Sequence, residues 1–280
     1  MPGVRIVTDS SCDLTAAEAE QHGITVVPLT IRFGADEFTD RQDLSVEDFY
    51  RRMEATDQLP ETAAPAPGAF EQAFRAAQAD GAEAVVCINI SSELSATMQS
   101  AVNGAKAIPE LPVHVIDSRT ITSGLGTLAI EAAKAAEAGA DADTVRKLLD
   151  DLIPRTRVFG ALNTLDNLKK GGRIGGAQAM LGSLLSIKPI VDISTGKVEE
   201  AGKARTRKKS LQWLYDRMKA DGAIEHVAVY HGDAEDIDEF LTLIGPDFPR
   251  DTVRIGKIGA VIGTHGGPAI IGVTWVVPAA

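Results

Sequence analysis

Hydroxyl side chains stand directly after three short apolar runs in the first half of the chain. They are Thr8, Ser10 and Ser11 after VRIV, then Ser91, Ser92, Ser95 and Thr97 after AVVCINI, and Ser118 after VHVID. Where such residues open a helix, their O–H groups join unpaired backbone N–H groups and the positive end of the helix dipole. This arrangement suits one anionic head group, a carboxylate or a phosphate. The simpler interpretation, that each serine only caps its helix, stays open.

His265 differs from the other four histidines because it lies in the glycine-rich segment GTHGG, residues 263–267. We expect this segment to be a turn between two apolar strands, and such a turn can carry an imidazole into a cavity. A plain tight turn is the alternative. One enzyme hypothesis follows, a hydrolase or transferase of acyl groups built from Ser95, His265 and Asp9, although the chain lacks a G-x-S-x-G motif.

The cysteines and the remaining glycine motifs indicate no metal and no cofactor. Cys12 and Cys87 are too few for a disulfide scaffold and lack the spacing of a zinc site, and the histidines form no metal-binding pattern. Gly124, Gly126 and Ala129 match the loose dinucleotide fingerprint, but they follow their strand by several residues. We therefore interpret them as helix packing. No Walker sequence is present.

Charge is strongly segregated along the chain. The 280 residues have a net charge of −11, yet residues 154–210 contain twelve basic residues and four acidic ones. This window is therefore +8 and the remainder is −19. Its densest parts are KKGGR at 169–173 and KARTRKK at 203–209, whose cations suit phosphate or an acidic partner, with a solvated face as the alternative. Since few aromatic residues accompany these cations, we expect no nucleic-acid binding.

Strand-like and helix-like segments alternate through the first half. Apolar runs predict strands at 4–7, 24–29, 84–90 and 113–116, and helical patterns predict helices at 14–21, 46–53, 68–79 and 123–138. Thr15 and Glu18 have the spacing of a capping box, and the Pro- and Ala-rich stretch 59–68 is expected to join two helices. The alternation is typical of βαβ units, so we predict an α/β, Rossmann-like domain with a parallel sheet at 1–153.

The pattern changes near residue 154. Helix-like stretches at 178–185 and 235–244 now alternate with strand-like segments at 187–193, 226–232 and 252–263. We predict an α+β domain with antiparallel strands at 154–280. Residues 258–280 carry no charge and are long enough to span a bilayer, but their Gly and Pro residues favour strand, glycine turn and strand in a protein core.

The first residues, MPGVRIVTDSS, show no basic region followed by a long apolar stretch. We therefore expect no signal peptide. With so few cysteines, the expected location is cytoplasmic.

Several motifs together resemble one known family. They are TDSSCDL, Pro28 closing VVPL, SSELSATMQSA, VIDS, LDNLKKGGRIGG, LLSIKPI, the ARTRKK run and IGTHGGP. In this order and at this spacing they resemble the DegV family along essentially the whole chain. The resemblance implies a bacterial cytoplasmic protein, not itself an enzyme, that holds a long-chain fatty acid in an apolar tunnel between a Rossmann-like domain and a C-terminal α/β domain. It further implies that a fatty acid kinase phosphorylates the presented carboxylate for phospholipid synthesis.

The same resemblance assigns residues to the head group and to the partner. Those expected at the carboxylate are Thr62, Ser95 and His265, with Thr264, Ser10 and Ser11 nearby. Those expected on the phosphate- and kinase-facing side are Lys170, Arg173, Arg205 and Arg207. The expected partners are thus a long-chain fatty acid and the kinase, with transient membrane contact for ligand exchange, and the oligomeric state stays open.

The chain departs from the family pattern near the expected head group. Ala63, Ala64 and Ala66 stand where the family usually has Ser, Gln and Ser, Ala96 stands in place of Gly, and Gly266 stands where Thr is frequent. Because two hydroxyls and an amide are missing, we expect a thinner or rearranged hydrogen-bond network around the carboxylate.

Overall fold

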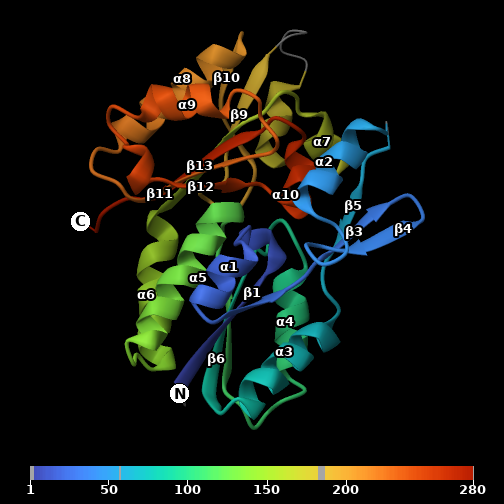
Figure 1. Ribbon diagram of the computed structural model, residues 1–280, viewed down its shortest axis with the longest axis vertical. Coiled ribbons are helices and arrows are strands. Elements are labelled where there is room, and N and C mark those ends of the chain that lie inside the picture. Colours follow the sequence, from blue (N-terminus) through green and yellow to red (C-terminus); the bar gives the residue numbers. More distant parts are fainter. Residues whose placement is uncertain (1–2, 57, 182–186, 280) are drawn as a thin grey trace.

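The computed structural model describes residues 3–56, 58–181 and 187–279. Its lower half in Figure 1 is built on a parallel sheet with the strand order β2-β1-β6-β7. These strands are β1 (Gly3–Asp9), β2 (Ile24–Val27), β6 (Ala82–Asn89) and β7 (Val113–Asp117). The helices of this half are α1 (Ala16–Gln21), α3 (Pro67–Ala79), α4 (Thr97–Ala105), α5 (Thr122–Glu137) and α6 (Ala142–Arg155), whereas α2 (Val46–Glu54) lies higher in Figure 1, beside the upper half. The predicted Rossmann-like parallel sheet is confirmed.

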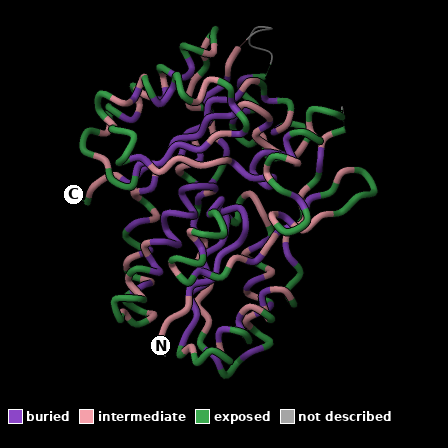
Figure 2. Tube along the Cα trace, viewed as in Figure 1, coloured by how far each residue is buried: buried purple, intermediate pink, exposed green. Residues whose placement is uncertain are grey.

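Apolar side chains alternate between the two faces of this sheet. On β6, Val85 and Cys87 pack with α3 and α4 in one cluster, whereas Val86 and Ile88 pack with α5 in another. Because both faces are buried, the strand reads as one unbroken apolar run, as expected for a parallel strand covered by helices on both sides. Figure 2 shows the buried centre of this half.

The start of α1 follows the predicted capping box. Thr15 Oγ1 accepts from the backbone N–H of Glu18 at 3.2 Å, and Glu18 Oε2 accepts from the backbone N–H of Thr15 at 2.8 Å. Two N–H groups that the helix leaves unpaired are satisfied in this way.

The upper half is a six-stranded mixed sheet with the order β10-β9-β8-β13-β11-β12. Its strands are β8 (Thr156–Ala161), β9 (Lys188–Asp192), β10 (Glu199–Ala204), β11 (Glu225–His231), β12 (Arg254–Lys257) and β13 (Ile271–Val276). Among the residues that the structure describes, every pair except β11–β12 is antiparallel. One face packs on α8 (Arg207–Ala220) and α9 (Ile237–Ile244), and the other faces the lower half. The predicted antiparallel component is confirmed.

A small third sheet has no counterpart in the sequence-based prediction. It has the order β4-β3-β5, with strands β3 (Thr30–Phe33), β4 (Asp36–Thr39) and β5 (Glu61–Ala63). The stretch 59–68, which we expected only to join helices, contributes β5. Strands of three or four residues leave too short a pattern for alternation to be recognised.

The strand predicted at 252–263 is confirmed only in its first part, where β12 (Arg254–Lys257) forms, and its predicted continuation into a glycine turn is wrong. Residues 260–266 form the helix α10 (Ala260–Gly266), so His265 lies in the last turn of a helix and not in a turn between two strands. Most of α10 is buried, and a helix that is apolar on most sides shows no amphipathic period to distinguish it from a strand. Within the described ranges, none of the helices combines the length and the apolar character needed to cross a bilayer.

Three shorter elements complete the second half. They are α7 (Asp166–Lys170), a 3₁₀ helix at Gly175–Met180 and another at Arg250–Thr252, which add to the 3₁₀ turn at Ser10–Cys12 in the first half. The helix predicted at 178–185 overlaps the Gly175–Met180 turn, and its residues 182–185 lie outside the described residues. The predicted domain boundary after residue 153 falls in the last turn of α6 and stays a prediction.

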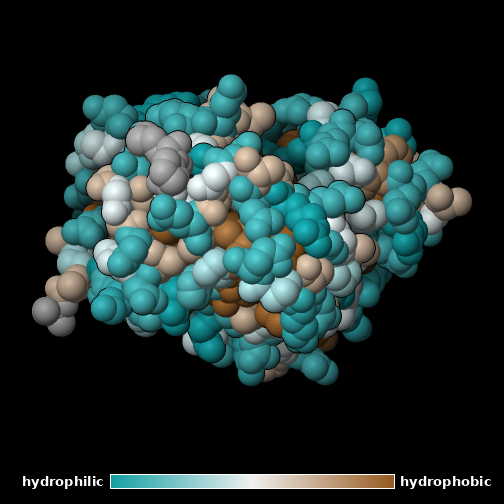
Figure 3. Space-filling view, turned by 90° about the horizontal axis from the view of Figure 1, so that it is seen from below, coloured by the Kyte–Doolittle hydropathy of each residue, from teal (hydrophilic) through white to brown (hydrophobic). Residues whose placement is uncertain are grey.

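The surface is predominantly polar. Figure 3 shows one face that is mostly hydrophilic, with hydrophobic residues visible near its middle. Leu181 is the sole large hydrophobic side chain in the described part of the chain that is classed as exposed. Apolar side chains are therefore concentrated in the interior, between the sheets and their helices and where the two halves meet.

Candidate functional site

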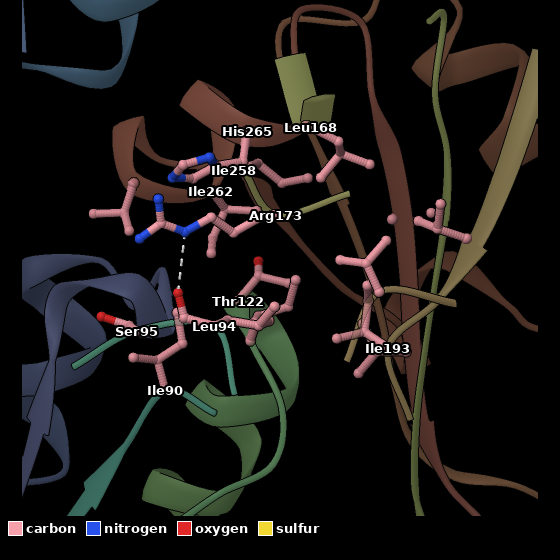
Figure 4. A pocket seen from close by; sticks show the side chains of 18 of the residues that line it. Ile90, Leu94, Ser95, Thr122, Leu168, Arg173, Ile193, Ile258, Ile262 and His265 are labelled. Carbon is pink, nitrogen blue, oxygen red and sulfur yellow. Dashed lines mark hydrogen bonds between the residues drawn. The ribbon is translucent and has the colours of Figure 1, made fainter. Parts of the chain in front are cut away.

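A cavity lies between the two halves and contains about 1010 Å³ of empty space, counting the part that is open to solvent. Its walls are predominantly apolar. The first half contributes Leu29, Ile90, Leu94 and Ile121, and the second contributes Val158, Leu162, Leu168, Val191, Ile193, Val198, Ile258, Val261, Ile262 and Ile270. The few polar side chains include Thr62, Ser95, Arg173 and His265, and Figure 4 shows Ser95, Arg173 and His265 toward one side of the cavity and Ile193 toward the other.

Thr62 and His265 meet at the polar side of the cavity. Thr62 lies on β5, paired with Ile31 of β3, and its Oγ1 is 3.0 Å from His265 Nε2 at the end of α10. The two residues are 203 positions apart in sequence. The small third sheet and α10, both missed by the sequence-based prediction, therefore create this contact.

The surroundings of His265 keep its imidazole neutral near pH 7. Burial lowers the pKa of His265 to about 4, with a smaller contribution from the positive charge of Arg173. The Nδ1 atom is buried without a hydrogen-bond partner among the described residues. It faces Gly171, where an added Cβ would come within 2.4 Å of Nδ1. Glycine at position 171, the first glycine of the KKGGR segment, thus allows the backbone of this segment to pack closely against the imidazole of His265.

Ser95 and Leu94 lie in the turn that leads from β6 into α4. Ser95 Oγ is 2.8 Å from Thr97 Oγ1 and accepts from the backbone N–H of Thr97 at 3.3 Å. The carbonyl of Leu94 accepts from Arg173 Nε at 3.3 Å, and Arg173 Nη1 donates to Gly171 O at 2.8 Å. Arg173 therefore connects the two halves beside the polar side of the cavity (Figure 4).

A buried carboxylate connects the N-terminal end of α10 to the first half. Asp13 accepts from the backbone N–H of Gly259 at 2.9 Å and from Thr122 Oγ1 at 2.6 Å, and it pairs with Arg41 at 2.8 Å. Asp13, Arg41 and Thr122 all have positive φ, at 56°, 62° and 46°. Non-glycine residues adopt this conformation at a cost that surrounding contacts must offset.

Three residues expected near the carboxylate do not line the cavity. Thr264 Oγ1 donates to the carbonyl of Ala260 inside α10. Ser10 Oγ accepts from the backbone N–H of Leu29, and Ser11 Oγ donates to Asp9. Their hydroxyls stabilise the backbone around the site.

Three further serines at the strand ends also tie loops together. Ser91 Oγ donates to Gly196 O at 2.6 Å, Ser92 Oγ donates to Asp117 at 2.5 Å, and Ser118 Oγ contacts the carbonyl of Thr120 at 3.3 Å. Of the serines in the three clusters, Ser95 alone lines the cavity in the described part of the chain.

Asp9 is engaged away from the histidine. Its carboxylate accepts from Ser11, from Asn89 Nδ2 at 3.1 Å and from the backbone N–H of Ile90 at 2.9 Å. Burial nevertheless raises the pKa of Asp9 above its ordinary value. Across the residues that the structure describes, no hydrogen bond joins Asp9 to His265 or Ser95 to His265. The contacts of Asp9 therefore join the ends of β1 and β6.

The basic residues expected to face a partner differ in their environment. Lys170 and Arg205 are exposed, and no acidic partner is found for either among the described residues. Arg207 instead forms a two-pronged ion pair with Asp236, at 2.7 and 3.0 Å, and this pair lowers the pKa of Asp236. Arg207 also donates to the carbonyls of Ala161 and Ala269, so its guanidinium holds α8 to the end of β8 and to the loop before β13.

The sequence-based reasoning expected an apolar tunnel from the family resemblance but named none of the residues that form its apolar wall. Val158 of β8 and Leu162, directly after its end, both line the cavity, and Gly160 lies between them in the sequence. A glycine inside a strand is a recognisable signal of close approach by a backbone or a ligand. That signal was available in the sequence at Gly160 and at Gly272.

A comparison of the whole chain with known families agrees with the fold. A family model described as "Uncharacterised protein, DegV family" matches residues 3–277. The chain belongs to the DegV family. It is 36% identical over 278 residues to a DegV domain-containing protein of Streptomyces coelicolor, covering 96% of this chain and 97% of the relative. It is 33% identical over 276 residues to one of Listeria monocytogenes, covering 97% and 98%.

Solved structures of DegV proteins share the fold along the full length. A DegV family protein from Thermus thermophilus described as binding fatty acid has a TM-score of 0.90 and 30% identity, with 99% of this chain and 100% of that chain covered. A stearic acid-binding protein from Eubacterium ventriosum has a TM-score of 0.87 and 29% identity, with 98% of each chain covered.

Proposed function

We propose that this DegV protein binds a long-chain fatty acid, with the acyl tail in the cavity between the two halves and the carboxylate at Thr62, Ser95 and His265. The observation that carries the proposal is the predominantly apolar cavity with its polar groups toward one side. Structural neighbours described as fatty-acid-binding proteins support it. The chain acts in the cytoplasm as a carrier that is not itself an enzyme.

The tail supplies most of the binding free energy. Burying one CH₂ group contributes about 0.8 kcal/mol, so about fifteen of them contribute on the order of 12 kcal/mol before the costs of association. A micromolar dissociation constant needs about 8 kcal/mol. The head group can therefore be held by neutral donors, without a strong charge pair.

The contact between His265 and Thr62 leaves one donor for the carboxylate. Because Nδ1 packs against Gly171 without a partner among the described residues, we assign the N–H to Nε2, since a buried orphan N–H is rarer than an orphan acceptor. Nε2 then donates to Thr62 Oγ1, and the Thr62 hydroxyl donates to a carboxylate oxygen. Ser95 Oγ offers a second hydroxyl, and Arg173 adds positive charge nearby.

The bound carboxylate is presented to a fatty acid kinase, which phosphorylates it to an acyl phosphate for phospholipid synthesis. Neutral hydroxyl donors orient the carboxylate while leaving its oxygens nucleophilic. The exposed cations Lys170 and Arg205 suit an acidic or phosphate-bearing partner. Loading of the carrier involves transient membrane contact, where free fatty acids partition.

Native mass spectrometry of the purified protein tests the lipid-binding proposal. The expected result is a mass increment of a C16–C18 acid, either co-purified or taken up on addition. Thr62→Val is expected to weaken uptake about tenfold, because a hydrogen bond to a charged group contributes about 1.5–3 kcal/mol. Thr144→Val, at an exposed position on α6, is the matched control and should not change uptake.

Two outcomes would contradict the proposal. One is the absence of any bound acid and of any uptake. The other is hydrolysis of an acyl ester by the isolated protein that disappears in Ser95→Ala, because that result would establish the Ser/His enzyme considered from the sequence.

A further inference from the structure

Two glycines lie side by side in the six-stranded sheet, on the face that lines the cavity. Gly160 of β8 and Gly272 of β13 are direct partners in the antiparallel pairing, and both line the cavity. Partners across antiparallel strands point to the same face of the sheet. At these two paired positions, β8 and β13 therefore present no side chain to the cavity. We call the surface formed by Gly160 and Gly272 the glycine trough.

Larger side chains border the glycine trough along the strand and on the next strand. Val158 of β8 lies two residues before Gly160 on the same face, and Leu162, directly after the end of β8, lies two residues beyond it; both line the cavity. Val191 of β9 is the cross-strand partner of Gly160 and also lines the cavity. The trough is thus a local depression in an otherwise filled apolar wall.

The residue on the other side of the trough leans away from it. Tyr230 of β11 is the partner of Gly272. Its ring lies over Gly256 of β12, where an added Cβ would come within 2.6 Å of the ring. The aromatic side chain therefore covers the outer strand and leaves Gly272 open to the cavity.

Neither the packing nor the backbone requires glycine at these two positions. An added Cβ would meet its nearest neighbours at 3.6 Å for Gly160 and 3.7 Å for Gly272, which are ordinary contacts, and neither residue has a positive φ in the left-handed range. By contrast, a Cβ on Gly263 would come within 2.6 Å of the Tyr50 hydroxyl. Glycine inside a strand destabilises a protein by about 0.5–1 kcal/mol relative to alanine. We therefore attribute the glycines at positions 160 and 272 to the cavity, which they leave open, and not to a requirement of the fold.

We propose that the glycine trough is the part of the cavity wall over which the acyl tail passes, and that it sets the longest fatty acid that the protein accepts. This inference rests on the proposed function. Apolar interiors respond to a change in volume of even one methylene. A side chain in the trough would occupy space that a long tail needs, while a shorter tail would still fit.

Competitive uptake of C12, C14, C16 and C18 acids, measured by native mass spectrometry, tests the role of the trough. The variants are Gly160→Val and Gly272→Val, with Gly160→Ala and Gly272→Ala as milder versions. Gly68→Ala is the control, because a Cβ there meets nothing within 4 Å and Gly68 does not line the cavity. The valine variants are expected to shorten the longest acid bound by about two carbons, and the alanine variants to shift the distribution in the same direction by less.

Thermal unfolding of the unliganded variants separates this role from a structural one. Valine favours strands, so the melting temperature is expected to be unchanged or raised while long-chain uptake falls. Folded valine variants with the wild-type ratio of C18 to C14 uptake would overturn the inference, and the alanine variants decide in the same way if valine prevents folding. A wild-type protein that takes up no acid would instead overturn the proposed function, and this inference with it.

Discussion

At the scale of the residue, burial in the folded protein keeps the imidazole of His265 neutral at pH 7. In the unfolded chain its pKa is near 6.5, and burial, aided by the positive charge of Arg173, lowers it to about 4 in the folded protein. Between these two pH values the unfolded chain binds a proton at this residue that the folded protein does not. The contribution of neutral His265 to stability is therefore complete above pH 6.5 and is lost as the pH falls toward 4.

A comparison of wild type with His265→Gln tests this at the scale of the residue. Urea unfolding of the unliganded proteins is measured between pH 7.5 and 4. Over this range the free energy of unfolding of the wild type should fall by up to about 3 kcal/mol more than that of the variant, since one pKa unit corresponds to about 1.4 kcal/mol. Other titrating groups are common to both proteins and cancel in the difference. Parallel pH profiles for the two proteins would show that His265 is not held neutral by the fold.

At the scale of the elements, the position of α10 depends on contacts with the first half. Asp13 holds the backbone of Gly259 at the N-terminal end of α10 and also contacts Arg41 and Thr122. Tyr50 of α2 adds a hydrogen bond from its hydroxyl to the carbonyl of Ile258 at 3.0 Å. Because His265 lies in the last turn of α10, these contacts also determine where the imidazole lies in the cavity.

Asp13→Ala is expected to lower the free energy of unfolding by about 3–5 kcal/mol, because it leaves the partly buried Arg41 and two further donors without their acceptor. Urea or thermal unfolding measures the loss. Arg32→Ala provides the control, since Arg32 pairs with Glu37 on the surface, with 45% and 59% of their side chains exposed, and should lose nothing measurable. Equal stability of the two variants would contradict the assigned role of Asp13.

At the scale of the whole molecule, positive and negative charges are unevenly distributed along the chain. The net charge of −11 combines a window of +8 at residues 154–210 with −19 elsewhere. Part of the positive charge is internal to the fold, as in the pair of Arg207 with Asp236. Other cations of this window, Lys170 and Arg205 among them, are exposed.

The double variant Lys170→Ala, Arg205→Ala separates lipid binding from presentation to a kinase. Fatty-acid uptake should match wild type, because neither side chain lines the cavity. Acyl-phosphate formation with a fatty acid kinase should fall about tenfold and depend less on salt, as expected when rim charges are removed. Arg146→Ala on α6 is the control. Unchanged turnover in the double variant would show that these cations have another role.

The sequence alone allowed prediction of the regular part of the fold and named some of the residues that line the cavity. Apolar runs identified the four parallel strands, and the spacing of Thr15 and Glu18 predicted the capping box, because these signals depend on neighbours in the chain. The resemblance to the DegV family singled out Thr62, Ser95 and His265, all of which line the cavity. It also included Ser10, Ser11 and Thr264, which the structure places outside the cavity wall.

Only the tertiary structure decided how these residues meet. The helix α10 has no amphipathic period because most of it is buried, so the sequence suggested a strand and a turn instead. The contact of Thr62 with His265 joins residues 203 positions apart, and the cavity wall joins two sheets. Local patterns report propensity and alternation within a few residues. The neutral state of His265 and the open space above Gly160 and Gly272 arise from the packing of distant segments, which no local pattern contains.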